Sequence, residues 1–208
     1  LLVAMFLLSS SVNTGWLLSD ENTLEEGKKI QYIFAQDAST KDNGISEELQ
    51  DRNNGNAPFA DVGIHNGNES RLIVQFPFSR VNTDRIIDAQ LVLSCASSPN
   101  TNGNAVMYAA PLHPFFEEYW SNWGESENNT PWDEAGADGV NDRDDWEAPT
   151  LYSGSAYVFL NVTSVVQQAA LNNDSSIAFV VSATDTQYRC YTREGPTNNI
   201  PFLNMNYT

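Results

Sequence analysis

Short apolar segments separated by turn residues recur through most of the 208 residues, and this spacing constrains the fold more than any other feature. The clearest segment is residues 71–76, where Leu72, Val74 and Phe76 face one way while Arg71 and Gln75 face the other. Comparable strand patterns occur at residues 31–35, 89–95, 105–110, 156–162, 176–182, 188–191 and 202–207. A series of short strands without a βαβ rhythm predicts an all-β fold, an antiparallel β-sandwich that is jelly-roll-like.

One helix and two long loops complete the predicted domain. Residues 163–171 predict a short helix that is capped by Asn161 or Thr163 and ends at Asn172 and Asn173. A polar loop is expected over residues 37–58, and a long Trp/Asp-rich loop after the strand at 105–110. We expect residues 31–208 to form one sandwich. Residues 1–30 are expected to be an apolar segment and a polar linker, with at most one helical turn in 19–29.

The first nineteen residues carry no charge. Their large apolar side chains are Leu1, Leu2, Val3, Met5, Phe6, Leu7 and Leu8. This segment is too short to span a bilayer, which leaves two interpretations. It is the remnant of a secretory signal peptide, or it docks into a neighbouring copy by strand addition. Because a closed antiparallel shell does not hide such a segment by itself, we favour self-association into a homopolymer, a filament or sheath.

The charge balance excludes one class of partner. The chain has 10 Lys and Arg residues against 27 Asp and Glu residues, a formal net charge of −17. Nucleic acid is therefore not an expected partner, since a polyanion would be repelled, and an anionic membrane surface is disfavoured for the same reason. Such acidity attracts cations and keeps an extracellular or cell-surface protein soluble, which is the location we predict.

Two cysteines and five glycosylation sequons bear on the same location. Cys95 and Cys190 both lie in strand-like segments, and the sequence leaves open whether they form a disulfide or remain two buried thiols. The sequons begin at Asn68, Asn128, Asn161, Asn173 and Asn206. All five are candidate glycosylation sites if the chain is secreted.

Residues 133–145 form an acidic loop with a spacing that resembles a twelve-residue calcium loop. The carboxylates at positions one, five, nine and twelve, and the backbone carbonyl at position seven, would come from Glu134, Asp138, Asp142, Asp145 and Val140. Gly139 falls at the sharp turn, but Gly136 supplies no side-chain ligand at position three. The sequence therefore predicts a degenerate calcium site, with a solvated acidic loop as the alternative.

Aromatic residues gather in the loop on both sides of this segment. The cluster comprises Phe115, Phe116, Tyr119, Trp120, Trp123, Trp132 and Trp146. If their side chains are exposed, Trp120, Trp123 and Trp146 would form a platform on which sugar rings stack. Buried, the aromatic side chains would form a second core beneath the long loop, which is the interpretation we favour because large aromatic side chains are mostly buried.

Motifs of catalysis are not found in the sequence, so we predict that the protein is not an enzyme. There is no Gly-x-Ser-x-Gly, no His-Glu-x-x-His and no phosphate-binding loop, and His65 and His113 are isolated in the sequence. Adjacent carboxylates at 117–118 and 133–134 could serve a glycosidase. Among 27 acidic residues, however, such pairs arise by chance.

Five segments, taken in order, resemble the DNRLRE domain family. They are residues 70–76 (SRLIVQF), 86–93 (IIDAQLVL), the Trp-rich stretch 118–138, 160–168 (LNVTSVVQQ) and 200–207 (IPFLNMNY). Ala169 and Ala170 stand where the family has an aromatic residue, and Ile200 stands where it has Arg. The resemblance implies a secreted β-sandwich related to carbohydrate-binding modules, with a binding or spacer role.

These observations predict a non-catalytic extracellular structural protein that assembles through its N-terminal segment. The alternative is a carbohydrate-binding or adhesion module that recognises a polysaccharide through the aromatic loop. Calcium is the one cofactor that the sequence predicts.

Overall fold

The computed structural model describes residues 22–25, 28–34, 40–78, 86–97, 105–113, 115–145, 147–152, 157–184 and 187–207. The strands are β1 (Asn22–Glu25), β2 (Lys28–Phe34), β3 (Lys41–Ser46), β4 (Phe59–His65), β5 (Asn68–Pro77), β6 (Ile86–Ser97), β7 (Ala105–Pro111), β8 (Glu125–Glu127), β9 (Thr130–Pro131), β10 (Glu147–Tyr152), β11 (Tyr157–Asn161), β12 (Ser176–Ala183), β13 (Tyr188–Tyr191) and β14 (Phe202–Tyr207). The helix is α1 (Thr163–Asn172).

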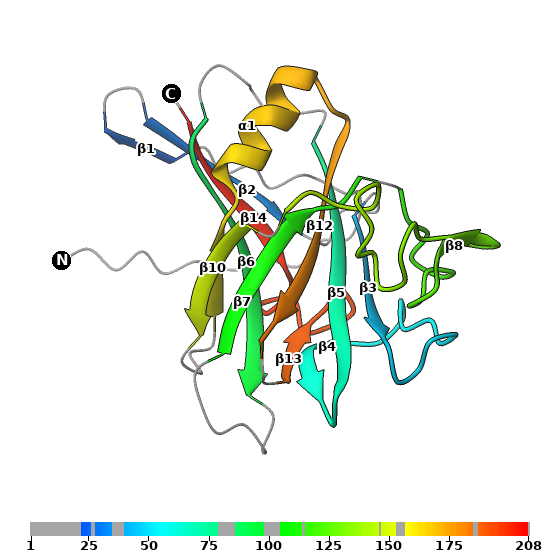
Figure 1. Cartoon of the computed structure of the whole chain (residues 1–208). Coiled ribbons are helices and arrows are strands. Elements are labelled where there is room, and N and C mark those ends of the chain that lie inside the picture. The colour runs from blue at the N-terminus through cyan, green and yellow to red at the C-terminus, as the bar shows by residue number, and fades with distance from the viewer. Residues whose placement is uncertain are drawn as a thin grey trace, which may run out of the picture.

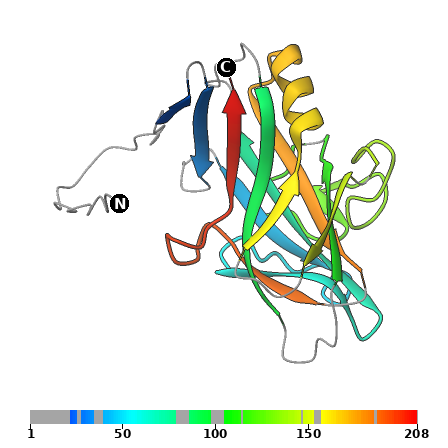
Figure 2. The same cartoon turned by 90° about the vertical axis from the view of Figure 1, so that its left-hand side faces the viewer.

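The strands form an all-β, antiparallel, sandwich-like fold with one short helix, as predicted. Twelve strands belong to one sheet with the path β1-β2-β14-β6-β13-β4-β5-β12-β7-β10, while β11 pairs with β6 and β3 with β5. The sheet bends over itself through β13 and β4, so that two layers face each other. Figure 2 shows β2 (blue), β14 (red) and β6 (green) side by side in one layer, and Figure 1 shows β7, β12 and β5 in the other.

The main core lies between these layers. Leu72, Val74 and Phe76 of β5 are buried there, opposite residues such as Leu91 of β6 and Leu203 of β14. Their alternation along β5 is the one that the sequence predicts, because side chains two residues apart share a face of the sheet.

The other face of β5 is buried as well. Arg71, Ile73 and Gln75 are nearly inaccessible, because the long connection between β7 and β10 covers this face. In Figure 1 this connection, which carries β8, lies beside β3 and β5. A second apolar cluster includes Ile73 of β5 and Trp123 and Trp132 of the connection. The prediction of a second core beneath the Trp-rich loop is confirmed for these two tryptophans.

A disulfide joins two neighbouring strands at the bend of the sheet. Cys95 of β6 and Cys190 of β13 are directly opposite each other in the strand register, and their Sγ atoms are bonded. The bond closes a loop with a sequence separation of 95 residues. In the chain-entropy model such a loop stabilises the folded state by about 4–5 kcal/mol.

The helix begins and ends close to the predicted residues, although its cap differs. The N-cap residue is Val162, whose side chain makes no capping hydrogen bond, while the predicted cap residue Asn161 accepts a hydrogen bond at Oδ1 from the N–H of Thr163, at 3.1 Å. The Thr163 hydroxyl is engaged elsewhere, since it accepts a hydrogen bond from the backbone of Ala89 in β6. Asn173 ends the helix in the left-handed conformation, at φ 57°.

Several strands were not predicted. Residues 37–58 do not form one loop, because they contain β3; β1 and the start of β2 occupy the predicted linker at 19–29. The sandwich therefore begins before residue 31. β4 and β10 were missed as well. β3 carries polar residues, among them Asp42 and Asn43, whose contacts come from distant parts of the chain, so periodicity does not reveal this strand.

The predicted assembly segment, Leu1 to Leu8, lies outside the described residues. Within the part of the chain that the structure describes, no helix has the length and apolar character of a membrane span.

Candidate metal centre

The predicted calcium loop is organised by its own hydrogen bonds. The Asp142 carboxylate is buried and accepts hydrogen bonds from the backbone N–H groups of Asp133, Glu134 and Gly139, at 2.8, 3.0 and 3.0 Å. Both of its oxygens are thereby used to shape the turn.

The remaining predicted ligands do not converge on Asp142. Asp138 instead pairs with two arginines, its Oδ1 lying 3.0 Å from Nε of Arg143 and 3.2 Å from Nη1 of Arg71. Glu134, Asp145 and the Val140 side chain are exposed. The structure therefore does not gather the five residues of the sequence-based calcium site, because the protein's own donors already satisfy its two central carboxylates.

The pairing of Asp138 is part of a larger group, the arginine cluster, which consists of Glu69, Arg71, Asp138 and Arg143. Arg71 is 4% exposed, binds both carboxylate oxygens of Glu69 at 2.8 Å, and donates to the carbonyl of Gly136 at 2.8 Å. Its guanidinium also stacks over the Trp123 ring, 5.4 Å from the ring centre. Two arginines thus face two carboxylates, and the formal charges cancel.

Pairing lowers the pKa of both carboxyl groups in the arginine cluster. Burial acts to raise the pKa of Glu69, but hydrogen bonds from Arg71 and Ser182 outweigh it. The pKa of Asp138 is lowered in the same way, because Arg143 and Arg71 outweigh the effect of burial.

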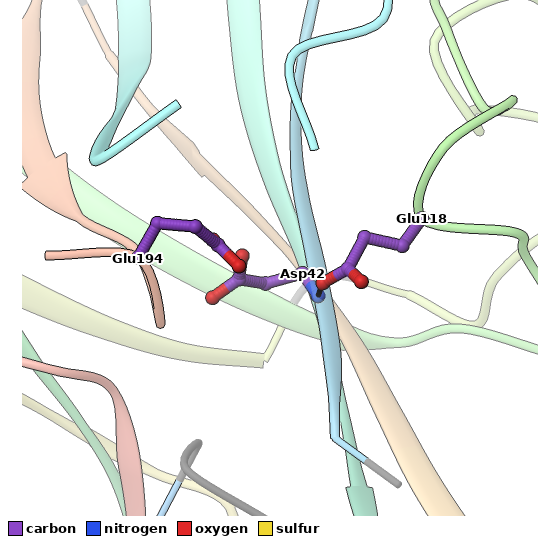
Figure 3. Close-up of side chains that lie close together, drawn as sticks. All are labelled: Asp42, Glu118 and Glu194. Carbon is purple, nitrogen blue, oxygen red and sulfur yellow. Dashed lines mark hydrogen bonds between the residues drawn. The ribbon is translucent and has the colours of Figure 1, made fainter. Parts of the chain in front are cut away.

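A second cluster of charged residues contains more carboxylates than guanidinium groups. We call Asp42, Glu118 and Glu194 the carboxylate cluster: one carboxylate oxygen of each lies within 4.8 Å of the other two. Asp42 comes from β3, Glu118 from the β7–β10 connection and Glu194 from the turn between β13 and β14 (Figure 3). Asp42 is 0% and Glu118 4% exposed. Among the described residues, it is the one group of three acidic, His or Cys side chains with the spacing of metal ligands.

Arg193 is the cation within this cluster. Its backbone N–H donates to Oδ2 of Asp42 at 2.7 Å, and its Nε lies 3.1 Å from Glu118 Oε1 and 2.9 Å from Glu194 Oε1. Its Nη1 donates to the carbonyl of Thr40. Because β3 pairs only with β5 among the described strands, the Asp42 N–H at this free edge is available to donate to Glu118 Oε1 at 3.1 Å.

Burial and neighbouring carboxylates raise the pKa of Asp42 and of Glu118. The pKa of Asp42 rises from 3.8 to about 8, chiefly because burial disfavours its charge; the Arg193 N–H opposes this, and Glu194 and Glu118 add to it. Burial likewise raises the pKa of Glu118. With no further cation, the cluster therefore holds a proton at neutral pH.

Two oxygens of the cluster have no donor. Oδ1 of Asp42 and Oε2 of Glu194 are buried and accept no hydrogen bond from any residue that the structure describes, and the same is true of Oγ1 of Thr40. A buried polar atom without a partner costs about 1–3 kcal/mol. The site therefore offers oxygens that its surroundings leave unsatisfied.

A network of side-chain amides fixes the backbone around Glu118. Asn53 Nδ2 donates to the carbonyls of Glu118 and Ser121 at 2.6 and 2.8 Å, and Asn43 Nδ2 donates to the same Ser121 carbonyl at 2.7 Å. The chain also passes very closely here, since a Cβ at Gly55 would lie 2.2 Å from the carbonyl oxygen of Glu118. The turn at residues 118–121 is thus held against β3 and the segment after it.

The predicted sugar platform is divided by the fold. Trp123 is 7% exposed and belongs to the second core, whereas Trp120 is 57% exposed. Trp146 lies outside the described residues. Tyr119 and Phe115, at 52% and 67%, are exposed on the same connection as Trp120. Trp123 is therefore a structural residue, and the accessible aromatic side chains are those of the segment around Glu118.

The sequons differ in exposure. Asn128, Asn161 and Asn173 are exposed, while Asn68 and Asn206 are partly buried. The Asn206 amide donates to Asp88, so glycosylation there would break a contact within the first layer.

The chain matches no protein-family model, and no curated protein matches it. The resemblance to the DNRLRE domain stays a prediction.

Sequence reasoning missed the carboxylate cluster. Its members stand 76 residues apart, Asp42 to Glu118, and a further 76 apart, Glu118 to Glu194. The one signal was the Glu117–Glu118 pair, which the fold separates into an exposed and a buried carboxylate.

Proposed function

We propose that the protein is a non-catalytic extracellular module that binds a polysaccharide through the aromatic turn, defined as Tyr119 and Trp120. The observation that carries this proposal is the half-exposure of two adjacent large aromatic side chains on a backbone turn fixed by the side-chain amides of Asn43 and Asn53. A rigid aromatic surface loses little entropy when a sugar ring stacks on it.

A cleft beside α1 adds to this support. Its volume is about 590 Å³, Phe115 lines it, and the amide groups of Gln75, Gln168 and Asn172 are among its lining side chains. Asp144 and Asp174 line the cleft as well, and such a mixture of apolar surface with amide and carboxylate groups suits sugars, whose rings have apolar faces and hydroxyl edges. The net charge of −17 favours an uncharged polysaccharide over a polyanion.

The disulfide between Cys95 and Cys190 supports an extracellular location, since such bonds persist in oxidising compartments. Assembly into a filament through residues 1–18 remains the prediction of the sequence, and those residues lie outside the described part of the chain.

Affinity electrophoresis against soluble neutral glucans, xylan and galactomannan, with alginate as an acidic comparison, tests the proposal. We expect retardation in a neutral glycan and a loss of affinity of roughly tenfold in Trp120→Ala, from the ~1.5 kcal/mol that burial of one ring contributes. Phe159→Ala is the matched control, because Phe159 is 50% exposed on β11, in the other layer.

Two results would contradict the proposal. One is the absence of retardation by every polysaccharide, and the other is equal binding by Trp120→Ala and the wild-type protein. Trp123→Ala is not a useful test, because removing a core tryptophan destabilises the fold.

A further inference from the structure

The carboxylate cluster has the composition of a cation site. Three carboxylates from three separate segments direct one oxygen each to within 4.8 Å of one another. Figure 3 shows the Asp42 carboxylate pointing toward that of Glu194, while Glu118 approaches Asp42 from the opposite side. Two oxygens that share one calcium ion, each at about 2.4 Å from it, lie no more than about 4.8 Å apart, so three oxygens within that limit are able to share one ion.

The unsatisfied oxygens point to a ligand independently of the clustering. Asp42 is completely buried, and its Oδ2 is bound by the Arg193 N–H while its Oδ1 has no donor among the described residues. Glu194 shows the same asymmetry: Arg193 binds Oε1, and Oε2 is buried with no donor in the described part of the chain. Thr40 lies two residues before Asp42, on the same side of the extended chain, and its hydroxyl also lacks a partner.

The net charge of the carboxylate cluster matches that of a divalent ion. Three carboxylates face one guanidinium, that of Arg193, so the fully ionised cluster has a formal charge of −2. The nearest lysine in the sequence does not compensate, because Lys41 donates to Glu117 and to the carbonyl of Phe116. A divalent cation would balance the cluster.

We propose that Asp42, Glu118 and Glu194 bind one calcium ion. The ligands are all oxygens, which hard cations select, and the Thr40 hydroxyl and water are available to complete a coordination number of six to eight. This site is distinct from the acidic loop at 133–145. The ion links the free edge of β3, the β7–β10 connection and the turn after β13.

One consequence rests on the proposed function. Glu118 immediately precedes Tyr119 and Trp120, so an ion held by Glu118 also holds the aromatic turn. Glycan affinity should then fall when calcium is removed. The calcium test below uses no glycan, so failure of one proposal is distinguishable from failure of the other.

Calorimetric titration of the full chain, freed of metal on a chelating resin, with calcium chloride tests the site. We expect one saturable site, and a rise in melting temperature of about 5–10 °C when free calcium is a hundredfold above its dissociation constant. Magnesium chloride should give a weaker effect, because magnesium demands a stricter octahedron.

Three isosteric variants locate the site. Glu194→Gln should lose the calcium heat and the melting shift, while Glu117→Gln and Glu134→Gln should keep both, since the first lies beside Glu118 and the second in the acidic loop. Circular dichroism establishes that each variant is folded. Asp42→Asn replaces Glu194→Gln if the latter does not fold.

The proposal is overturned if the wild-type protein shows neither calcium heat nor a melting shift. It is also overturned if Glu194→Gln and Asp42→Asn bind like wild type, or if Glu134→Gln alone abolishes binding, which would place the ion in the acidic loop.

Discussion

The arginine cluster and the carboxylate cluster are built from the same residue types at two ends of the β7–β10 connection, yet they differ in balance. In the arginine cluster two guanidinium groups meet two carboxylates, and both carboxylate oxygens of Glu69 accept hydrogen bonds from Arg71. In the carboxylate cluster one guanidinium meets three carboxylates, and two buried oxygens have no donor among the residues that the structure describes. The charges of the arginine cluster are balanced within the protein, whereas those of the carboxylate cluster are balanced only when another cation is bound.

The same difference appears in the pKa values. Pairing lowers the pKa of Glu69 and Asp138, whereas burial raises that of Asp42 to about 8. A carboxylate with its cation inside the protein is stabilised as the anion, and one without such a cation is stabilised as the neutral acid. Burial alone therefore does not decide the sign of a pKa shift.

The largest expected effect comes from breaking the balanced cluster. Arg71→Met leaves Glu69 and Asp138 without their shared partner, and removing one member of a buried pair costs about 3–5 kcal/mol of unfolding free energy. Urea denaturation measures this. The matched control is Arg189→Met, whose exposed pair with Asp61 contributes about 0–1 kcal/mol. Equal losses in the two variants would contradict the distinction between the clusters.

A smaller effect distinguishes the two clusters by the pH dependence of the free energy of unfolding, measured in protein freed of calcium. Glu69 and Asp138 have lowered folded-state pKa values, so their contribution is present at neutral pH and is lost as pH falls below about 4. Asp42 has a raised folded-state pKa, so its contribution is present below about pH 4 and is lost as pH rises to about 8. Glu118, Glu194 and Arg193 are the charged groups that face Asp42, and each of them acts on the pKa of Asp42.

Asp42→Asn isolates that titration, because the amide has the same shape and no charge. The unfolding free energy of the calcium-free wild type should decline between about pH 5 and pH 8, and that of Asp42→Asn should decline less. Urea denaturation at each pH gives both curves. Parallel curves would show that Asp42 does not titrate in this range.

The sequence predicts the main sandwich because its inner strands are periodic. Leu72, Val74 and Phe76 alternate within one strand, and Asn173 supplies the left-handed residue that ends the helix. β3 was hidden because its side chains are polar: Asn43 and Asp42 are buried only through contacts with residues near Ser121 and Arg193. No local pattern records such partners.

The site was hard to predict for the same reason. The acidic loop attracted a calcium prediction because its carboxylates are close in sequence, but Asp142 and Asp138 are satisfied by backbone N–H groups and arginines. Asp42 and Glu194 are isolated acids in sequence, and folding alone brings them together. Spacing along the chain predicts a site only when one loop supplies all of its ligands.

A crystal structure of the protein grown with calcium, with anomalous differences recorded, shows directly whether the carboxylate cluster holds the ion. We expect one anomalous peak between Asp42 Oδ1 and Glu194 Oε2, with Glu118 beside it and oxygen distances of about 2.3–2.6 Å. A saturated crystal without a peak there, or with its one peak among Glu134, Asp138 and Asp142, would contradict it.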